Sequence, residues 1–268
     1  MSLAMRTFSS FIFDLDGVLY LGSTPIRGAA EALCELGRRN CRIFFLTNNA
    51  TKTRGQYRKK LAAMGIDAKK KHIYTSAYGT AKYLVQEKIR KVFVVGEAGL
   101  KREIRGAGVR ICTGEEADAV VVGLDRKFDY KKLAHAASAI RNGALFIATN
   151  TDATLPLENG FAPGAGAMVE AAATASGKRP EVIIGKPQTF LIEDILDEND
   201  FQKREVAFVG DRLDTDMLAS NKLGIFSFCV LTGSTDKHSA SRARGLYKPG
   251  KIIKSVEEVL KYAKEATD

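Results

Sequence analysis

Several residue types are scarce in this chain, and each shortage argues against a class of protein. The 268 residues include no tryptophan, three histidines and four cysteines. The cysteines stand far apart with no C-x-x-C pair, which argues against a zinc site and a disulfide framework. We expect buried free thiols in a reducing cytoplasm. No apolar run approaches the roughly 18 residues of a membrane span, so we expect no membrane partner.

The chain is basic, with a net charge of +10, and 45% of its residues are hydrophobic. This hydrophobic content is typical of a globular protein with a packed core. The positive charge suits either nucleic acid or small anions as partners. It is spread along the chain without an arginine-rich arm, and only eight tyrosines accompany it. We therefore expect no nucleic-acid partner and favour small anionic ones.

Short apolar runs alternate with segments of helical periodicity, a pattern typical of βα units and parallel sheets. Strands are predicted near 11–15, 43–46, 73–75, 92–95, 119–122, 145–148, 182–184, 206–209 and 226–231. Helices are predicted near 29–39, 53–64, 77–88, 98–107, 130–142, 165–177, 189–198 and 213–223. The fold class is therefore α/β.

Acidic residues follow two of the predicted strands. Asp14 and Asp16 come at the end of the first strand, and Asp211, Asp214 and Asp216 follow the strand at 206–209. Because ligands of open α/β sheets gather beyond the carboxyl ends of the strands, these acids suit a hard cation that prefers oxygen ligands. Turn formation and helix capping are the alternative roles, and Asp214 fits that alternative best.

Complementary groups follow two other strands. Thr47, Asn48 and Asn49 offer a hydroxyl and turn amides that suit a phosphate oxygen, and Lys186 offers an ammonium group. A carboxylate that attacks a phosphate dianion at about 3.5 Å is opposed by roughly 10 kcal/mol at an effective dielectric near 20. A divalent cation such as Mg²⁺, together with a nearby lysine, would offset this repulsion. A covalent aspartyl-phosphate would then split the hydrolysis into two easier steps.

These motifs resemble, in order, the four motifs of the haloacid dehalogenase-like (HAD) phosphatases, and their fuller strings resemble the NagD-like, 4-nitrophenylphosphatase branch. The matching segments are Asp14-Leu-Asp-Gly-Val-Leu-Tyr20, Leu46-Thr-Asn-Asn49, Gly185-Lys-Pro187 and Gly210-Asp-Arg-Leu-Asp-Thr-Asp216. The resemblance covers essentially the whole chain. It implies a doubly wound, Rossmann-like parallel sheet as the core.

The resemblance also implies a role for each motif residue. Asp14 would be the nucleophile and a metal ligand, and Asp16 the general acid and base, with its backbone carbonyl also touching Mg²⁺. Thr47 and the amide of Asn48 would hold the phosphoryl group. Lys186 would neutralise the charge of the phosphoryl group. Asp211 would be the third protein ligand of the metal, and Asp216 would support Asp211.

The stretch between Thr47 and Lys186 is far longer than one βα unit needs. It resembles an inserted α/β cap of the C2 type, which we place at 80–180, between core segments at 1–79 and 181–268. Caps of this branch imply a homodimer formed through the cap. Within this stretch we expect Asp152 to be a surface loop acid, the alternative being a cap-loop acid directed toward substrate, and we expect Gly164 to begin a helix.

The sequence therefore predicts a cytoplasmic, Mg²⁺-dependent phosphomonoesterase of small phosphorylated metabolites, with 4-nitrophenyl phosphate as an artificial substrate. Sugar phosphates, nucleoside monophosphates, phosphoglycolate and pyridoxal phosphate all remain open as natural substrates. The alternatives are an aspartate-phosphorylated signalling receiver, a dehalogenase of the same superfamily and a basic binding protein. Asp16 argues against the first two, because neither requires a proton donor at that position.

Overall fold

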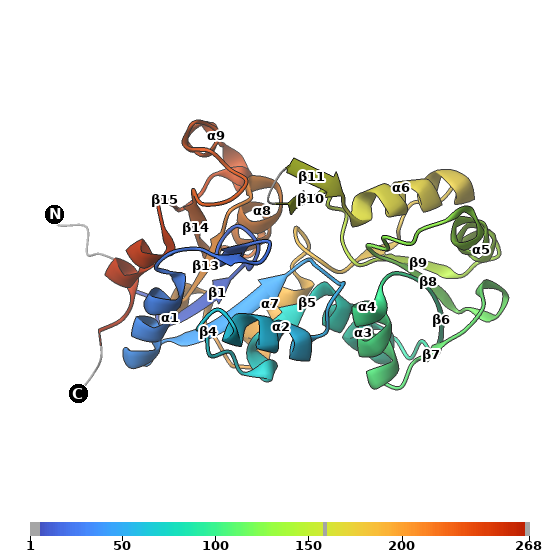
Figure 1. The fold of residues 1–268 in the computed structure, drawn as a ribbon, viewed down its shortest axis with the longest axis horizontal. Coiled ribbons are helices and arrows are strands. Elements are labelled where there is room, and N and C mark those ends of the chain that lie inside the picture. Colours follow the sequence, from blue (N-terminus) through green and yellow to red (C-terminus); the bar gives the residue numbers. More distant parts are fainter. Residues whose placement is uncertain (1–5, 158–159, 266–268) are drawn as a thin grey trace. The chain divides into compact units, whose positions relative to one another are not determined.

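The chain folds into two compact units, each built around its own parallel sheet (Figure 1). The computed structural model describes residues 6–157 and 160–265. Unit 1 contains Met1–Leu46, Arg58–Ile73 and Lys186–Asp268, and unit 2 contains Thr47–Tyr57 and Tyr74–Gly185. The assignment of residues 80–180 as a cap over the core stays a prediction.

A six-stranded sheet forms the centre of unit 1, in the order β15-β14-β13-β1-β4-β5, and its last two strands end in unit 2. In chain order these strands are β1 (Ser10–Phe13), β4 (Arg42–Thr47), β5 (Ile73–Thr75), β13 (Val206–Gly210), β14 (Phe226–Val230) and β15 (Lys251–Ile253). β1 pairs in parallel with both β4 and β13. Because the chain winds outward from β1 in both directions, the order reverses between β1 and β13. This arrangement confirms the predicted doubly wound fold and identifies the switch point where such sheets bind ligands.

Aromatic side chains fill much of the unit 1 core. Phe8, Phe11 and Phe228 are fully buried, and the Phe8 ring meets the Phe228 ring edge-on at a centroid separation of 6.0 Å. Edge-to-face pairs of this kind add to the free energy of burial. The helices of this unit are α1 (Ala29–Arg38), most of α2 (Arg54–Ala62), α7 (Phe190–Asp197), α8 (Leu218–Lys222) and α9 (Lys237–Arg242). The strand tips described below are therefore anchored in a rigid core.

Unit 2 contains a five-stranded parallel sheet in the order β12-β9-β8-β6-β7. Its strands are β6 (Lys91–Val95), β7 (Arg110–Ile111), β8 (Ala119–Val122), β9 (Leu145–Ala148) and β12 (Val182–Ile183), and its helices are α3 (Ser76–Gln86), α4 (Ala98–Gly106), α5 (Tyr130–Arg141) and α6 (Ala165–Ser176). Helices α5 and α6 pack together (Figure 1). Their small side chains share a cluster with those of the sheet. Valine and alanine dominate this cluster, with Phe146 as its one fully buried aromatic residue among those described.

The sequence analysis missed several short elements. They include the antiparallel hairpins β2–β3 (Tyr20–Leu21 and Thr24–Pro25) and β10–β11 (Thr154–Leu157 and Gly160–Pro163), the edge strands β7 and β15, helix α9 and the 3₁₀ helix Val256–Tyr262. Strands of two to four residues are too short for an alternating pattern to stand out. Gly164 does begin helix α6, as predicted.

The cysteines follow the prediction in part. All four are free, and Cys41 and Cys229 are buried as expected. The expectation of burial is wrong for Cys34, which is exposed on α1, and for Cys112, which is half-buried. Across the described part of the chain, no helix combines the length and apolar character that a membrane crossing requires.

Candidate active site

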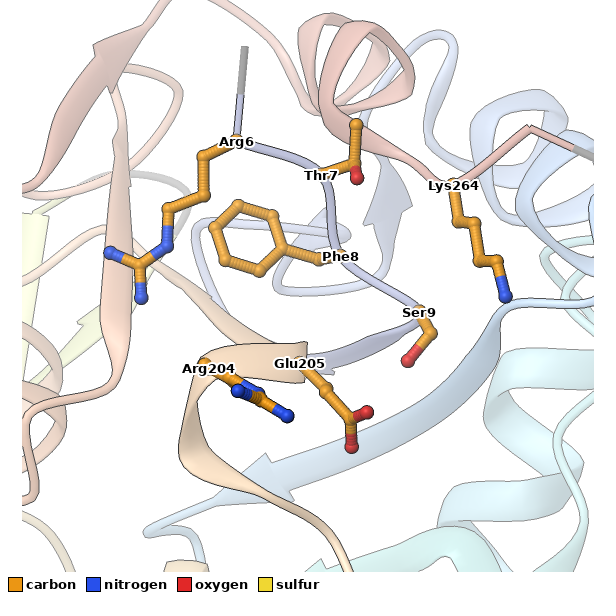
Figure 2. Close-up of a pocket in the computed structure, with 7 residues that line it drawn as sticks. All are labelled: Arg6, Thr7, Phe8, Ser9, Arg204, Glu205 and Lys264. Atoms are coloured by element: carbon orange, nitrogen blue, oxygen red, sulfur yellow. The ribbon is translucent and has the colours of Figure 1, made fainter. Parts of the chain in front are cut away.

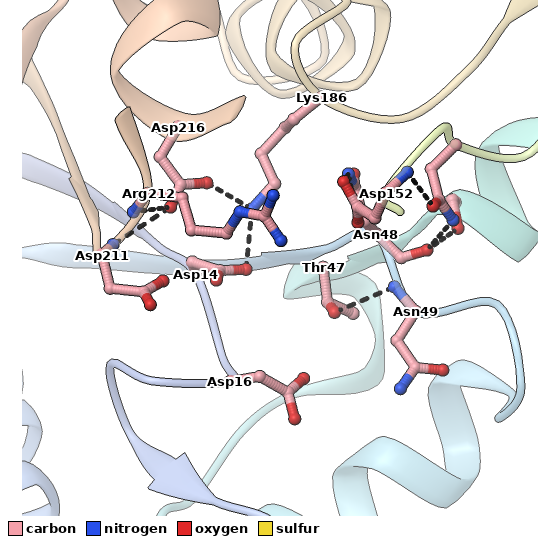
Figure 3. A network of polar contacts seen from close by, with 12 residues as sticks. Asp14, Asp16, Thr47, Asn48, Asn49, Asp152, Lys186, Asp211, Arg212 and Asp216 are labelled. Carbon is pink, nitrogen blue, oxygen red and sulfur yellow. Dashed lines mark hydrogen bonds and ion pairs between the residues drawn. The ribbon is translucent and has the colours of Figure 1, made fainter. Parts of the chain in front are cut away.

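The tips of β1 and β13 bring two of the predicted acids to the switch point of the unit 1 sheet. Asp14 directly follows β1, and Asp211 directly follows β13. The two strands are in register, with Phe13 beside Val209, and the Asp14 amide donates to the Val209 carbonyl at 2.8 Å. Parallel pairing therefore forces both carboxylates to the same edge of the sheet, as Figure 3 shows.

Lys186 joins two carboxylates of this group. Its Nζ lies 2.7 Å from Asp14 Oδ1 and 2.6 Å from Asp216 Oδ1, and all three side chains are nearly or fully buried. Burial alone would lower the pKa of Lys186, but the two carboxylates outweigh it and raise the pKa above its ordinary value. Burial, together with the charges of Asp216 and Asp211, raises the pKa of Asp14 despite the opposing effect of Lys186.

Asp216 ties the fourth motif together. Its Oδ2 accepts the backbone amides of Asp211 and Arg212 at 3.0 and 3.1 Å, while its Oδ1 faces Lys186. The residue lies in a π-helical turn, Leu213–Met217, which precedes α8 and is a feature often found at functional sites. Both carboxylate oxygens of Asp216 are therefore engaged by protein groups. This geometry is what a residue that holds Asp211 in place requires.

Asp211 has one oxygen committed and one available. Its Oδ2 accepts the Ser234 amide at 2.6 Å, whereas its buried Oδ1 has no hydrogen-bond partner among the described residues. Burial, with the charge of Asp216 next, raises the pKa of Asp211 to about 6. A buried carboxylate oxygen without a donor is costly unless a cation or a proton meets it.

The acid cluster fits a divalent cation. Asp14, Asp211 and Asp216 each offer an oxygen, and these atoms lie within 4.8 Å of one another. Three carboxylates against the single ammonium of Lys186 leave two negative charges, which one divalent cation would balance. Oxygen ligands of this kind suit Mg²⁺ or Ca²⁺. Three residues were predicted to bind metal, and the side chains of two of them, Asp14 and Asp211, belong to this cluster. The third carboxylate of the cluster comes from Asp216, not from Asp16.

Asp16 lies two residues beyond Asp14 in a tight turn of unit 1. It is half-buried, and its Oδ2 accepts the Tyr20 hydroxyl at 3.3 Å. The turn depends on Gly17, whose φ of +84° is unfavourable for other residues and whose Cβ, if present, would lie 2.5 Å from Asp211 Oδ2. The chain therefore leaves β1 sharply, and the Asp16 carboxylate is separated from the buried acids (Figure 3).

Thr47 is the last residue of β4, and Asn48 and Asn49 follow it in the part of the chain that belongs to unit 2. Thr47 is 2% exposed, and its hydroxyl oxygen accepts the Asn49 amide at 3.1 Å, so its hydrogen is left as a donor. Asn49 Oδ1 accepts both the amide and the hydroxyl of Thr51, at 3.0 and 2.7 Å. The loop is therefore fixed by its own short side chains.

The structure corrects the expectation for Asp152. This residue is half-buried rather than exposed, and both its carboxylate oxygens accept the side-chain amide of Asn48, at 3.3 and 3.1 Å (Figure 3). Asn150, which the sequence analysis did not name, donates from Nδ2 to the Asn48 carbonyl at 2.8 Å. It follows strand β9, so the rule that drew attention to the other strand tips could have found it.

Two further features of the described residues lie away from the acid cluster. His72 packs its ring against Phe44, with centroids 4.9 Å apart. A hollow of about 440 Å³ is lined by residues that include Phe8, Ser9, Arg204 and Glu205 (Figure 2). These residues precede β1 and β13, so the hollow is at the amino ends of strands whose carboxyl ends carry Asp14 and Asp211.

A parallel α/β sheet with a buried aspartate cluster and a lysine at its switch point defines a class of enzyme that handles anionic substrates beside a cation. The comparisons with known proteins identify the family. Residues 11–110 match the model of the haloacid dehalogenase-like hydrolases, and residues 183–259 match a second model described as HAD-hydrolase-like. The chain belongs to this family, and the predicted resemblance is confirmed.

The similar proteins are phosphatases. The chain is 41% identical to an acid sugar phosphatase of Staphylococcus epidermidis over 230 residues, which cover 85% of this chain and 88% of that protein. A 4-nitrophenylphosphatase from Thermotoga maritima superposes with a TM-score of 0.91 at 32% identity, covering 97% and 99% of the two chains. A glycerol phosphate phosphatase from Mycobacterium tuberculosis, solved with magnesium, gives 0.87 at 34% identity, covering 97% and 78%. The chain is a phosphatase of the HAD type.

Proposed function

We propose that this phosphatase hydrolyses small phosphorylated metabolites, sugar phosphates above all, with Mg²⁺ as its cofactor and an aspartyl-phosphate as its intermediate. 4-Nitrophenyl phosphate would serve as an artificial substrate. The observation that carries the proposal is the buried cluster of Asp14, Lys186, Asp211 and Asp216, whose excess of two negative charges suits a divalent cation. The relatives named for sugar phosphates and for 4-nitrophenyl phosphate support the substrate class.

In the first step, a carboxylate oxygen of Asp14 attacks phosphorus and forms the acyl-phosphate bond as the bond from phosphorus to the leaving oxygen breaks. Asp16 donates a proton to that leaving oxygen. Lys186, which already contacts Asp14, reduces the repulsion between the carboxylate and the phosphate dianion. The hydroxyl of Thr47 and the amide of Asn48 would hold the phosphoryl oxygens.

In the second step, Asp16 takes a proton from water, and the water oxygen attacks phosphorus. The bond between phosphorus and Asp14 breaks, so inorganic phosphate leaves and the free carboxylate returns. Asp14, the backbone carbonyl of Asp16 and Asp211 would hold Mg²⁺, with Asp216 supporting Asp211. When bound, the cation supplies positive charge where negative charge accumulates during phosphoryl transfer.

Two substitutions test this mechanism with 4-nitrophenyl phosphate. Asp14→Asn should lower kcat by at least about 1,000-fold, because removal of a nucleophile eliminates the covalent route. Asp16→Asn should release about one equivalent of 4-nitrophenol quickly and then stall, because this leaving group needs little protonation whereas the acyl-phosphate still needs a base. Rapid-quench kinetics and phosphoprotein mass spectrometry would measure the burst and the trapped intermediate.

Full activity of Asp14→Asn, or full activity in the presence of EDTA, would contradict the proposal. A panel of phosphorylated metabolites at matched concentration would identify the substrate class, and sugar phosphates should be hydrolysed with the highest kcat/KM. The signalling-receiver alternative predicts a stable phosphoprotein instead of turnover, so phosphate release from the panel also separates those two functions. Homodimerisation and a cytoplasmic location stay predictions.

A further inference from the structure

We propose that Asp152 is a positioning residue that acts through Asn48 to fix the loop at residues 47–51, and that phosphoryl transfer therefore depends on it. The inference rests on the proposed function, in which this loop holds the phosphoryl group. All the contacts that carry it lie inside unit 2. They join the loop after β4 to the segment at residues 149–152, which follows β9 about a hundred residues later in the chain.

The side chain of Asn48 is oriented by the carboxylate of Asp152. Its Nδ2 donates to both carboxylate oxygens of Asp152, and only 7% of the residue is exposed. Its Oδ1 lies over Gly185, where a Cβ would come within 2.5 Å of it. A carboxylate is an acceptor only, so Asp152 dictates which end of the Asn48 amide faces it. An asparagine at position 152 could present either its oxygen or its NH₂ group, and this orientation would no longer be specified.

The backbone of Asn48 is held by the same segment. Its carbonyl accepts from Asn150 Nδ2 at 2.8 Å and also from the Ser76 hydroxyl at the start of α3. Two donors use both lone pairs of this carbonyl oxygen, and Asn150 and Ser76 are themselves buried. Side chain and main chain of Asn48 are therefore both anchored. The neighbouring Thr47 hydroxyl and Asn48 amide, which are proposed to meet the phosphoryl oxygens, inherit this fixed position.

Asp152 is itself held in place. Its amide donates to Asn150 Oδ1 at 3.1 Å, and its carbonyl accepts the amide of Gly166, in the first turn of α6, at 2.9 Å. The carboxylate thus extends from a backbone that is bonded on both sides. Hydrogen bonds from a neutral amide to a carboxylate are stronger than those between neutral groups, so the contact with Asn48 can set the geometry of the loop.

A positioning role predicts a loss that is the same for every substrate, because the loop contacts the phosphoryl group that all substrates share. The isosteric Asp152→Asn variant and the truncated Asp152→Ala variant should each lower kcat/KM by about 10- to 100-fold, as expected for a misplaced catalytic group. 4-Nitrophenyl phosphate and glycerol phosphate should lose by the same factor. Inhibition by orthovanadate, a mimic of the transferring phosphoryl group, should weaken in parallel. The Mg²⁺ concentration for half-maximal activity should stay unchanged.

A double-mutant cycle tests the route through Asn48. Asn48→Ala keeps the backbone amide but removes the side chain that Asp152 holds. If Asp152 acts through that side chain, Asn48→Ala combined with Asp152→Ala should be no slower than the slower single variant. Multiplied losses in the double variant would overturn the proposal. Should Asp152→Ala fail to fold, the cycle is run with the isosteric Asp152→Asn and is read in the same way.

The control is Asp129→Asn, another aspartate of unit 2, which caps α5 through the Lys132 amide and should leave kcat/KM unchanged. Wild-type kinetics in Asp152→Asn, or unequal losses for the two substrates, would overturn the proposal, because unequal losses indicate contact with the leaving group.

The Asp14→Asn variant distinguishes failure of the positioning role from failure of the proposed function. If it is inactive while Asp152→Asn is normal, only the positioning role fails; if it is active, the proposed function itself fails.

Discussion

The two units stabilise their polar groups in opposite ways. In unit 1, charged groups are buried against one another: Lys186 pairs with both Asp14 and Asp216. The nearby Asp211 Oδ1 has no hydrogen-bond donor among the described residues. In unit 2, the loop from Thr47 to Thr51 is held mostly by hydrogen bonds between neutral hydroxyls, amides and a backbone carbonyl. The first arrangement carries an excess of buried negative charge, whereas the second is built mainly from hydrogen bonds between neutral groups.

This difference separates chemistry from positioning. Buried charges raise or lower one another's pKa, and their excess of negative charge favours the binding of a cation. Neutral networks contribute little charge but restrict geometry, because an unsatisfied buried group would be costly. Substitutions in the acid cluster of unit 1 should therefore change activity, stability and pH dependence together. Substitutions in the loop of unit 2 should change activity without this change in pH dependence.

The largest combined effect is expected for Lys186→Met. Loss of the ammonium leaves Asp14 and Asp216 buried without their common partner, which typically costs about 3–5 kcal/mol of folding free energy. The variant should also lose at least about 100-fold in kcat, as when one group that stabilises a transition-state charge is removed. Chemical denaturation and 4-nitrophenyl phosphate turnover measure the two effects.

Lys222→Met is the matched control for this change. Lys222 is a lysine of the same unit that donates to the Pro187 carbonyl at 3.0 Å and is not part of the acid cluster. Lys222→Met also removes one positive charge, but from an exposed side chain. Its folding free energy and its turnover of 4-nitrophenyl phosphate should therefore stay near the wild-type values. If Lys186→Met were within about twofold of Lys222→Met in both stability and turnover, the prediction would be wrong. The buried charge of Lys186 would then matter no more than an exposed one.

A smaller effect should appear in the pH dependence of metal stabilisation. The pKa of Asp211 is raised to about 6, so without metal its contribution to folding is present at acid pH and is lost as the pH rises through that value. Mg²⁺ would reverse this loss, because it binds the deprotonated form. The gain in unfolding free energy from Mg²⁺ at about 100 times its Kd should approach 2.7 kcal/mol well above the pKa and shrink below it.

Thermal unfolding with and without MgCl₂, measured on both sides of the pKa of Asp211, tests this prediction. Asp211→Asn should abolish the difference, since the amide neither titrates nor carries the charge that a cation requires. An Mg²⁺-dependent shift that is equal at acid and neutral pH, or that persists in Asp211→Asn, would contradict the assignment of the cation to this cluster.

Asp14 and Asp211 could be located from the sequence because each directly follows a buried strand. Apolar runs such as Phe11–Phe13 and Val206–Val209 mark the strands, and parallel pairing then brings whatever follows them together. Asp14, Lys186, Asp211 and Asp216 do meet as the motifs implied. The choice of Asp216 over Asp16 as the third acid of the cluster could not be predicted, because it depends on the turn at Gly17 and on the π-helical turn.

The contacts in unit 2 were harder to predict from the sequence. Asn48 and Asp152 are separated by 104 positions, and no periodic pattern connects a loop residue to so distant a partner. The short hairpin β10–β11 follows Asp152 directly and was also missed. Strand periodicity thus finds groups at the ends of long buried strands, but hydrogen bonds between two loops depend on backbone geometry that composition does not encode.

The smallest effect is expected for Asp214→Asn. This variant tests whether an acid of the fourth motif must be buried to contribute to activity and stability, or whether its negative charge is enough. Asp214 belongs to the same motif as Asp211 and Asp216, but its side chain is 63% exposed and pairs with Arg212 at 2.8 Å. Exposed ion pairs contribute at most about 1 kcal/mol, so the variant should lose less than that in stability and less than about twofold in kcat/KM. Denaturation and steady-state kinetics beside Asp211→Asn measure the contrast. A loss comparable to that of Asp211→Asn would mean that a negative charge anywhere in the motif is enough for activity. Burial of the charges in unit 1 would then not explain why they perform chemistry whereas the hydrogen-bonded loop of unit 2 only positions groups.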